Sequence, residues 1–222
     1  MIRNLIFDFD GTLADTAAGI LATEREMLRR MGLPEPGQAQ MCSAIGLPLP
    51  ESLRRGCDIP AGRVEEAVRL YRDLFFDYAP QHILIFDGVR ETLATFSRRG
   101  IRMAIATSRS SNSLDVILAT HALTDYFPER VTADQGIRAK PAPDMVLHLL
   151  RKMEIQAGQT LVVGDTTFDL EMGKGAGCLT AGVSYGNHSR DRLSTVSPDW
   201  IVDRFDELEA IVFPSGTDGS RG

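Results

Sequence analysis

Short, largely apolar runs alternate with amphipathic segments along most of the chain. Between the runs, apolar residues recur at helical spacing, as in residues 89–100. A short run that is apolar throughout is typical of a strand buried on both faces. Strands that alternate with helices need crossover connections, so the pattern predicts an α/β fold whose mostly parallel sheet is covered on both faces. The predicted strands are residues 5–7, 103–106, 161–163 and 179–183, with a late strand at 199–202.

Residues 15–88 break this rhythm, because they contain helical patterns and turn signals but no strand pattern. One helix is predicted from about residue 17 to 31, where Gly32 ends it, and another begins near Pro60. We therefore expect an all-helical cap, inserted after the first strand and lying above the strand ends. The predicted parts are a core of residues 1–14 and 89–213, a cap of residues 15–88 and a flexible tail of residues 214–222.

Asp8 and Asp10 directly follow the first predicted strand. Side chains alternate along an extended chain, so both carboxylates project to one side, and Gly11 allows a sharp exit. Asp8 suits covalent catalysis, since a carboxylate can displace an alkoxide from phosphorus. Asp10 could protonate the leaving oxygen and then deprotonate the attacking water. Two like charges this close favour a raised pKa on one of them.

A second acidic segment follows the predicted strand at 161–163 and contains Asp165 and Asp169. Ligands of parallel sheets bind outside the carboxyl ends of the strands, so Asp165 is expected to lie near Asp8. Asp8, Asp165 and the backbone carbonyl of Asp10 would offer the oxygen ligands that Mg²⁺ prefers. Asp169 has a supporting role in this prediction, holding either Lys140 or a metal-bound water, with a helix N-terminal acid as the alternative.

Thr107 and Lys140 supply the donor and the cation that phosphoryl transfer needs. The phosphoryl group in flight spreads negative charge over its equatorial oxygens. Thr107 follows the predicted strand at 103–106, and Lys140 precedes a proline that restricts its backbone. Taken singly, these residues are more typical of a turn and a solvated lysine; together with the acids they predict a phosphoryl-transfer site.

The chain carries 24 Lys and Arg against 30 Asp and Glu, a net charge of −6, with no basic run. Nucleic acid is therefore not an expected partner. The three cysteines show no C-x-x-C spacing, which favours a reducing cytoplasm. No segment reaches the length of a membrane span. We expect a cytoplasmic monomer or weak homodimer. Mixed charges at 24–30 predict a solvated helix face, and the histidines are expected on solvent or helix faces: His82, His121, His148 and His188.

These motifs together resemble those of the haloacid dehalogenase-like hydrolases, and among them the phosphoglycolate-phosphatase-like branch with a small helical cap. The resemblance runs from Asp8 to about Val183. Asp8, Asp10, Gly11 and Thr12 match the first motif; the remaining matches are Thr107, Lys140, Asp165 and Asp169. The resemblance implies a Rossmann-like three-layer core, bound Mg²⁺ and a cap that opens during turnover. The true dehalogenases lack an acid at the place of Asp10, so the presence of this aspartate favours phosphoryl chemistry.

The resemblance also implies a substrate-facing cap loop, which residues 44–48 match. Gly46 in this loop, with Ser108 and Arg109 of the core, are predicted substrate-binding residues. The expected activity is hydrolysis of a small phosphate monoester, such as phosphoglycolate or a sugar phosphate, through an aspartyl-phosphate. A phosphomutase is an alternative, although the loop lacks the basic residue typical of sugar-phosphate mutases. A pyrophosphatase is a second alternative, and a non-catalytic binding module is a third.

Overall fold

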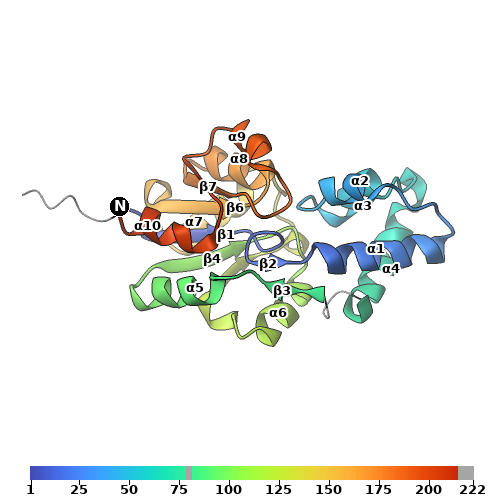
Figure 1. The fold of residues 1–222 in the computed structure, drawn as a ribbon, viewed down its shortest axis with the longest axis horizontal. Coiled ribbons are helices and arrows are strands. Elements are labelled where there is room, and N and C mark those ends of the chain that lie inside the picture. Colours follow the sequence, from blue (N-terminus) through green and yellow to red (C-terminus); the bar gives the residue numbers. More distant parts are fainter. Residues whose placement is uncertain (79–81, 215–222) are drawn as a thin grey trace, which may run out of the picture.

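The computed structural model describes residues 1–78 and 82–214, and the tail predicted at 214–222 lies almost wholly outside them. Its main element is a six-stranded sheet in the order β5-β4-β1-β6-β7-β8, in which every neighbouring pair is parallel. The central strands are the ones predicted as buried apolar runs. The predicted α/β fold with a mostly parallel sheet is therefore confirmed (Figure 1).

The sheet consists of β1 (Asn4–Phe7), β4 (Arg102–Ala106), β5 (Glu129–Val131), β6 (Thr160–Gly164), β7 (Leu179–Val183) and β8 (Trp200–Val202). The helices of the core are α5 (Val89–Arg98), α6 (Ser111–Thr120), α7 (Asp144–Lys152), α8 (Thr167–Gly175), α9 (Arg190–Ser194) and α10 (Leu208–Val212). The strand β5 is absent from the predicted set, because only its last residue is fully buried and the apolar pattern is missing.

The two faces of the sheet belong to two separate apolar clusters. Leu5 and Phe7 of β1 pack with residues of α5, α6 and α10, whereas Ile6 packs on the opposite face with residues of α7 and α8. This division follows from the alternation of side chains along a strand. Helices therefore cover both faces, which gives the three layers that the sequence predicts.

The helices inserted after β1 form a separate layer beyond one edge of the core (Figure 1). They are α1 (Ala17–Met31), α2 (Gln38–Ser43), α3 (Leu49–Gly56) and α4 (Val64–Tyr78). The long helices α1 and α4 pack against each other through buried side chains such as Met27, Leu28, Ala67 and Leu74. We call α1–α4 the cap. Gly32 ends α1 in the left-handed conformation with φ 65°, as its position in the sequence predicts.

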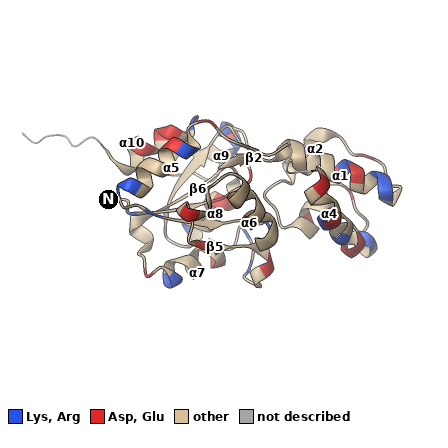
Figure 2. Cartoon of the chain, turned by 90° about the horizontal axis from the view of Figure 1, so that it is seen from below, with Lys and Arg blue, Asp and Glu red and all other residues tan. Residues whose placement is uncertain are grey.

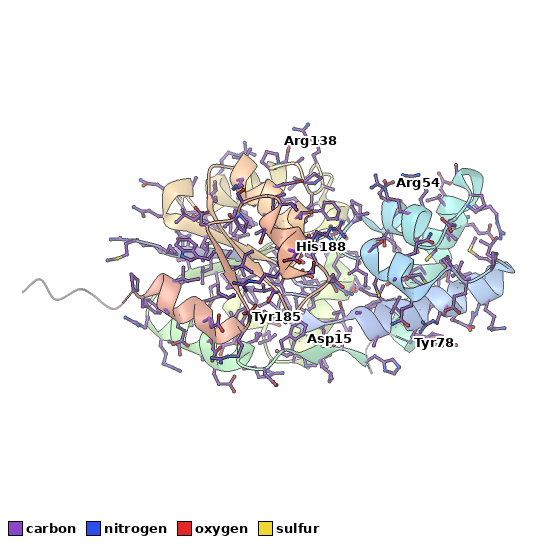
Figure 3. All side chains as sticks on the ribbon, turned by 45° about the horizontal axis from the view of Figure 1, so that its top comes forward. Asp15, Arg54, Tyr78, Arg138, Tyr185 and His188 are labelled. Carbon is purple, nitrogen blue, oxygen red and sulfur yellow. The ribbon has the colours of Figure 1, made fainter. Side chains whose placement is uncertain are left out.

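The expectation that residues 15–88 contain no strand is wrong. Two short strands, β2 (Ala14–Asp15) and β3 (Leu84–Ile85), pair antiparallel and join the cap to the core. Strands of two residues are too short to produce a periodic pattern, so the sequence could not reveal them. Figure 3 shows Asp15 and Tyr185 at this junction.

Charged residues of both signs are interspersed along the helices of core and cap (Figure 2). Within residues 1–78 and 82–214, no helix is both long and apolar enough to cross a membrane.

Candidate active site

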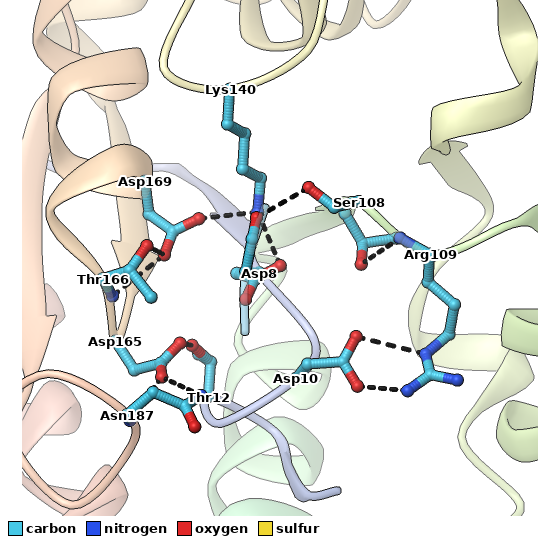
Figure 4. A network of polar contacts seen from close by, with 12 residues as sticks. Asp8, Asp10, Thr12, Ser108, Arg109, Lys140, Asp165, Thr166, Asp169 and Asn187 are labelled. Atoms are coloured by element: carbon cyan, nitrogen blue, oxygen red, sulfur yellow. Dashed lines mark hydrogen bonds and ion pairs between the residues drawn. The ribbon is translucent and has the colours of Figure 1, made fainter. Parts of the chain in front are cut away.

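The register of the parallel strands brings the predicted acidic residues to one edge of the sheet. Phe7 lies level with Ile105 of β4 and with Val163 of β6. The residues that follow these strands, Asp8, Thr107 and Asp165, therefore emerge together at the carboxyl edge. All three are buried, with 3%, 0% and 0% of their surface exposed. Sequence reasoning predicts this convergence, and Figure 4 shows it for Asp8 and Asp165.

Lys140 binds two carboxylates at the centre of this cluster. Its Nζ donates to Asp8 Oδ1 and to Asp169 Oδ1, each at 2.6 Å (Figure 4). All three side chains are almost fully buried. Asp169 also accepts from the backbone and hydroxyl of Thr166, which makes it the third residue of a helix capping box at the start of α8. Asp169 is thus both the Lys140 partner and the helix N-terminal acid that the sequence offers as alternatives.

Asp10 is paired with Arg109 rather than with Asp8. The Arg109 guanidinium donates from Nε to Asp10 Oδ2 at 3.1 Å and from Nη2 to Asp10 Oδ1. Arg109 is 9% exposed and also donates to Ser113 Oγ. Its guanidinium lies 4.9 Å from the ring centre of Phe75 in the cap. The predicted substrate-binding residue Arg109 is therefore occupied with Asp10 in this conformation.

Asp165 is held by neutral donors. One of them, Asn187, lies on a loop that the sequence analysis did not single out. Asn187 donates to Asp165 Oδ2 from its backbone at 2.7 Å and from its side chain at 2.8 Å, and Thr12 donates to Oδ1 at 3.1 Å. Gly11 permits this approach: with φ 81°, a Cβ at this position would lie 2.2 Å from Asp165 Oδ2. Only glycine therefore fits at position 11 of the first motif, beside Asp165.

Burial changes the acid strength of the cluster. Burial raises the pKa of Asp8 well above its ordinary value; Lys140 opposes this rise, and the charges of Asp169 and Asp165 add to it. Burial likewise raises the pKa of Asp165 to about 7, with repulsion from Asp169 adding to the rise and the Asn187 hydrogen bonds opposing it. The sequence predicts a raised pKa on one acid of the first motif from the repulsion of two like charges, whereas the raised pKa of Asp8 is caused mainly by burial and least by Asp10.

The acid cluster fits a divalent cation. Asp8, Asp165 and Asp169 each offer an oxygen, and these three atoms lie within 4.8 Å of one another. Asp8 Oδ2 is buried without a hydrogen-bond partner within the described residues. With Asp10, four carboxylates pair with two cations, Lys140 and Arg109, among the described residues, so these cations do not balance the negative charge. Buried charges need such a counterpart, and oxygen ligands favour a hard ion such as Mg²⁺.

A cavity of about 520 Å³ opens above this cluster, between core and cap. Asp8 and Asp10 line its core end, and the cap loop with Ile45, Gly46 and Leu47 lines another wall. Gly46 has φ 96°, and a Cβ there would lie 3.0 Å from Thr166 of the core. The Gly46 carbonyl accepts a hydrogen bond from Ser108 Oγ at 2.8 Å. The predicted substrate-binding residues Gly46 and Ser108 are thus brought together, and they join the cap to the core.

Thr107 lies buried beside the cluster, where its Oγ1 accepts the backbone N–H of Arg109 at 3.2 Å. His188 contradicts the expectation of an exposed histidine, because it is 1% exposed in the core and its Nδ1 accepts the backbone N–H of Thr167 at 3.0 Å (Figure 3). It follows Asn187 on the loop that holds Asp165, and burial lowers its pKa to about 4. No spacing pattern in the sequence connects this loop with Asp165.

Proteins of known families resemble this chain over nearly its full length. A protein of Dickeya dadantii (strain 3937) named probable phosphatase IndB is 38% identical over 208 residues, covering 92% of this chain and 90% of its own. A phosphoglycolate phosphatase of Pectobacterium atrosepticum is 30% identical over 216 residues, covering 95% and 92%. A crystal structure from Bacteroides fragilis, described as a haloacid dehalogenase-like hydrolase, superposes with a TM-score of 0.89 at 25% identity, covering 94% of this chain and 100% of that one.

The family model of the haloacid dehalogenase-like hydrolases matches residues 5–183. This span includes every residue that carries the resemblance, from Asp8 in the first motif to Asp169. It also includes the whole cap, all but the first residue of β1, and the strands β2 to β7. The chain therefore belongs to the haloacid dehalogenase-like hydrolases.

Proposed function

We propose that this protein is a Mg²⁺-dependent phosphatase that hydrolyses small phosphate monoesters through an aspartyl-phosphate on Asp8. The observation that carries the proposal is the Asp8 carboxylate itself. Lys140 binds one oxygen, whereas the other is buried and has no partner within the described residues, and Asp8 lines a ligand-sized cavity. A carboxylate oriented in this way is suited to attack a bound phosphorus atom. The names of the two bacterial relatives support phosphoryl chemistry.

In the first step, an Asp8 oxygen forms a bond to phosphorus and the bond from phosphorus to the ester oxygen breaks. The leaving oxygen takes a proton from Asp10. Asp10 must part from Arg109 and take up a proton from solvent before it can carry out this transfer, because Arg109 now engages both of its oxygens. Arg109, once released, becomes available to an anionic group of the substrate, in keeping with its predicted role.

In the second step, Asp10 accepts a proton from a water molecule, whose oxygen bonds to phosphorus. The bond between phosphorus and Asp8 breaks, so inorganic phosphate leaves and Asp8 is restored. In this mechanism, Thr107 and Lys140 stabilise the equatorial oxygens of the phosphoryl group. Because Thr107 Oγ1 accepts from Arg109, its own hydrogen remains free to donate.

Asp8, Asp165 and the Asp10 backbone carbonyl would hold Mg²⁺, with Asp169 keeping Lys140 in place. The ion supplies positive charge that offsets the repulsion between the phosphoryl group and Asp8. The excess of acids over bases in the cluster supports this assignment.

The proposal is tested by phosphate release together with trapping of the covalent intermediate. The protein is mixed with acetyl phosphate and Mg²⁺, quenched in acid, digested and analysed by mass spectrometry. We expect a phosphorylated peptide that contains Asp8, and phosphate release that stops with a chelator and returns with Mg²⁺. Turnover in a metal-free preparation, or phosphate on a different side chain, would refute the mechanism.

A further inference from the structure

Glu24 is a buried carboxyl group that the proposed mechanism does not use. It lies in the middle of α1 in the cap and is 1% exposed. Neither of its carboxyl oxygens accepts a hydrogen bond from a nitrogen or hydroxyl donor within residues 1–78 and 82–214, and the neighbouring Cys57 thiol is only a weak donor. A buried polar group without a partner costs free energy, so an unpaired carboxyl group requires an explanation.

The position of Glu24 relates it to the cavity. Glu24 and Ile20 both line the cavity, and their separation of four residues places them one above the other on the same face of α1. The cavity also reaches Asp8 and Asp10. Tyr71, which lines the wall between, experiences the charge of Glu24 as well as that of Asp10. Since α1 rises about 10 Å between its first residue and Glu24, this carboxyl group lies at the cap end of the cavity.

The surroundings of Glu24 favour its neutral form. Burial raises its pKa to about 8, and the hydrogen bond from the Cys57 thiol and the charge of Arg25 only partly oppose the rise. A protonated carboxyl group donates one hydrogen bond and accepts others. The cavity is lined by apolar residues such as Ile45 and Phe75 as well as by polar ones such as Tyr71. A ligand group that both donates and accepts would satisfy Glu24, and a hydroxyl group is the simplest one.

We propose that Glu24 determines substrate specificity by hydrogen bonding to a hydroxyl group on the organic part of the phosphate ester. The substrates would then be polyhydroxylated phosphate esters, such as sugar phosphates, rather than two-carbon acids. This inference rests on the proposed function, because the phosphoryl group must bind at Asp8. The cavity volume of about 520 Å³ suits a ligand larger than a two-carbon ester.

The experiment compares three substrates by kcat/KM: glucose 6-phosphate, n-hexyl phosphate and acetyl phosphate. The first two have similar length but differ in hydroxyl groups, and the third is too short to reach Glu24. Replacing Glu24→Met keeps the length of the side chain and removes its polar atoms. We expect this variant to lower the ratio of glucose 6-phosphate to n-hexyl phosphate at least about tenfold, because a site that hydrogen-bonds a hydroxyl discriminates strongly. Acetyl phosphate should stay within about twofold.

Two further variants separate recognition from stability. Glu24→Gln also donates and accepts, so it should keep the wild-type ratio within about threefold. Glu26→Gln, on the same helix but paired with Arg29 and Arg30 at the surface, is the matched control and should change nothing. If Glu24→Met does not fold, the test rests on the kcat/KM ratios of the wild type and Glu24→Gln. A wild type that shows no preference for glucose 6-phosphate over n-hexyl phosphate overturns the inference.

An unchanged ratio in Glu24→Met, or an equal loss on all three substrates, would also overturn it. A wild type that releases phosphate from none of the three, acetyl phosphate included, would instead refute the proposed function, and this inference with it. A wild type that hydrolyses acetyl phosphate but shows no preference refutes the role of Glu24 alone.

Discussion

The two ends of the cavity differ in how their polar groups are paired. At the core end, Asp8, Asp10, Asp165 and Asp169 all accept hydrogen bonds from protein donors. At the cap end, neither carboxyl oxygen of Glu24 accepts from a nitrogen or hydroxyl donor within the described residues, and only the weakly donating Cys57 thiol lies beside it. Groups that must act on the same atoms in every turnover are best held rigidly, and strand ends provide that rigidity. A recognition group can remain unsatisfied until its ligand binds.

The two regions also differ in how they are supported. The core residues follow strands whose neighbours fix them on both sides, whereas the cap packs mainly on itself through α1 and α4. The two-residue strands β2 and β3 tie the cap to the core, together with contacts such as that of Ser108 with Gly46. Short connections of this kind can act as hinges, so closure can be coupled to binding. Chemistry should therefore depend on the core, and preference among substrates on the cap.

The largest expected effect comes from Asp8→Asn. The amide has nearly the same volume but cannot act as the nucleophile, so turnover should fall to the blank for every substrate. The measurement is phosphate release from acetyl phosphate and from larger esters. Asp115→Asn, at a surface ion pair with Arg130, is the control and should keep full activity. Turnover of the Asp8→Asn variant near the wild-type rate would remove Asp8 from its role.

The next effect separates the two acids beside Asp8. Lys140 neutralises Asp169, whereas the hydrogen-bond donors to Asp165 are uncharged. Asp165→Ala should therefore raise the Mg²⁺ concentration needed for half-maximal activity at least about tenfold, and more than Asp169→Ala does. A magnesium titration of both variants at saturating substrate measures the ranking. The opposite ranking would exchange the two roles.

How far the sequence predicts this site depends on how local each signal is. Asp8, Thr107 and Asp165 directly follow apolar runs, so their convergence is predictable from the parallel sheet. Asn187 and His188 lie on a loop without periodicity, and only the folded chain brings them to Asp165 and Thr167. Partners of this kind depend on tertiary contacts that no short pattern encodes.

The prediction that places Glu24 on a solvated face is wrong, although a signal for its burial is present in the sequence. The buried residues Leu21, Leu28 and Met31 share with Glu24 the spacing of three, four and three residues that marks one face of a helix. The neighbouring charges at 25, 26, 29 and 30 hide this pattern. The pairing of Arg109 with Asp10 could not be predicted, because a basic residue after a strand is equally typical of the surface.

A smaller effect on turnover is expected for Gly46→Ala. The backbone at Gly46 has φ 96°, and the added Cβ would lie 3.0 Å from Thr166. The loop must therefore shift and weaken its bond with Ser108, which should lower kcat/KM about tenfold for large esters. Gly37→Ala is the matched cap control, because a Cβ there meets nothing within 4 Å. Equal activity of the two variants would contradict a closing role for the loop.

The smallest effect on turnover, but a clear one on stability, is expected for Glu24→Gln. The pKa of Glu24 is about 8 in the folded protein, against an ordinary value of 4.5. A raised folded pKa means that the folded state keeps a proton which the unfolded chain loses above pH 4.5. The stability that Glu24 contributes is therefore fully present below pH 4.5 and is lost as the pH rises to about 8. Glutamine does not titrate, so the Glu24→Gln variant does not show this loss of stability as the pH rises.

Urea unfolding of both proteins at several pH values measures the difference. The free energy of unfolding of the wild type should decrease relative to Glu24→Gln by up to about 1.4 kcal/mol per pH unit across that range. Asp8 and Asp165 titrate alike in both proteins, so their contributions cancel in the difference between the two free energies of unfolding. Cys57 and Tyr71, which face Glu24, do not interfere, because burial raises the pKa of each beyond this range. Parallel stability curves would show that Glu24 is already ionised, and a carboxylate would then accept, but not donate, at the cap end of the cavity.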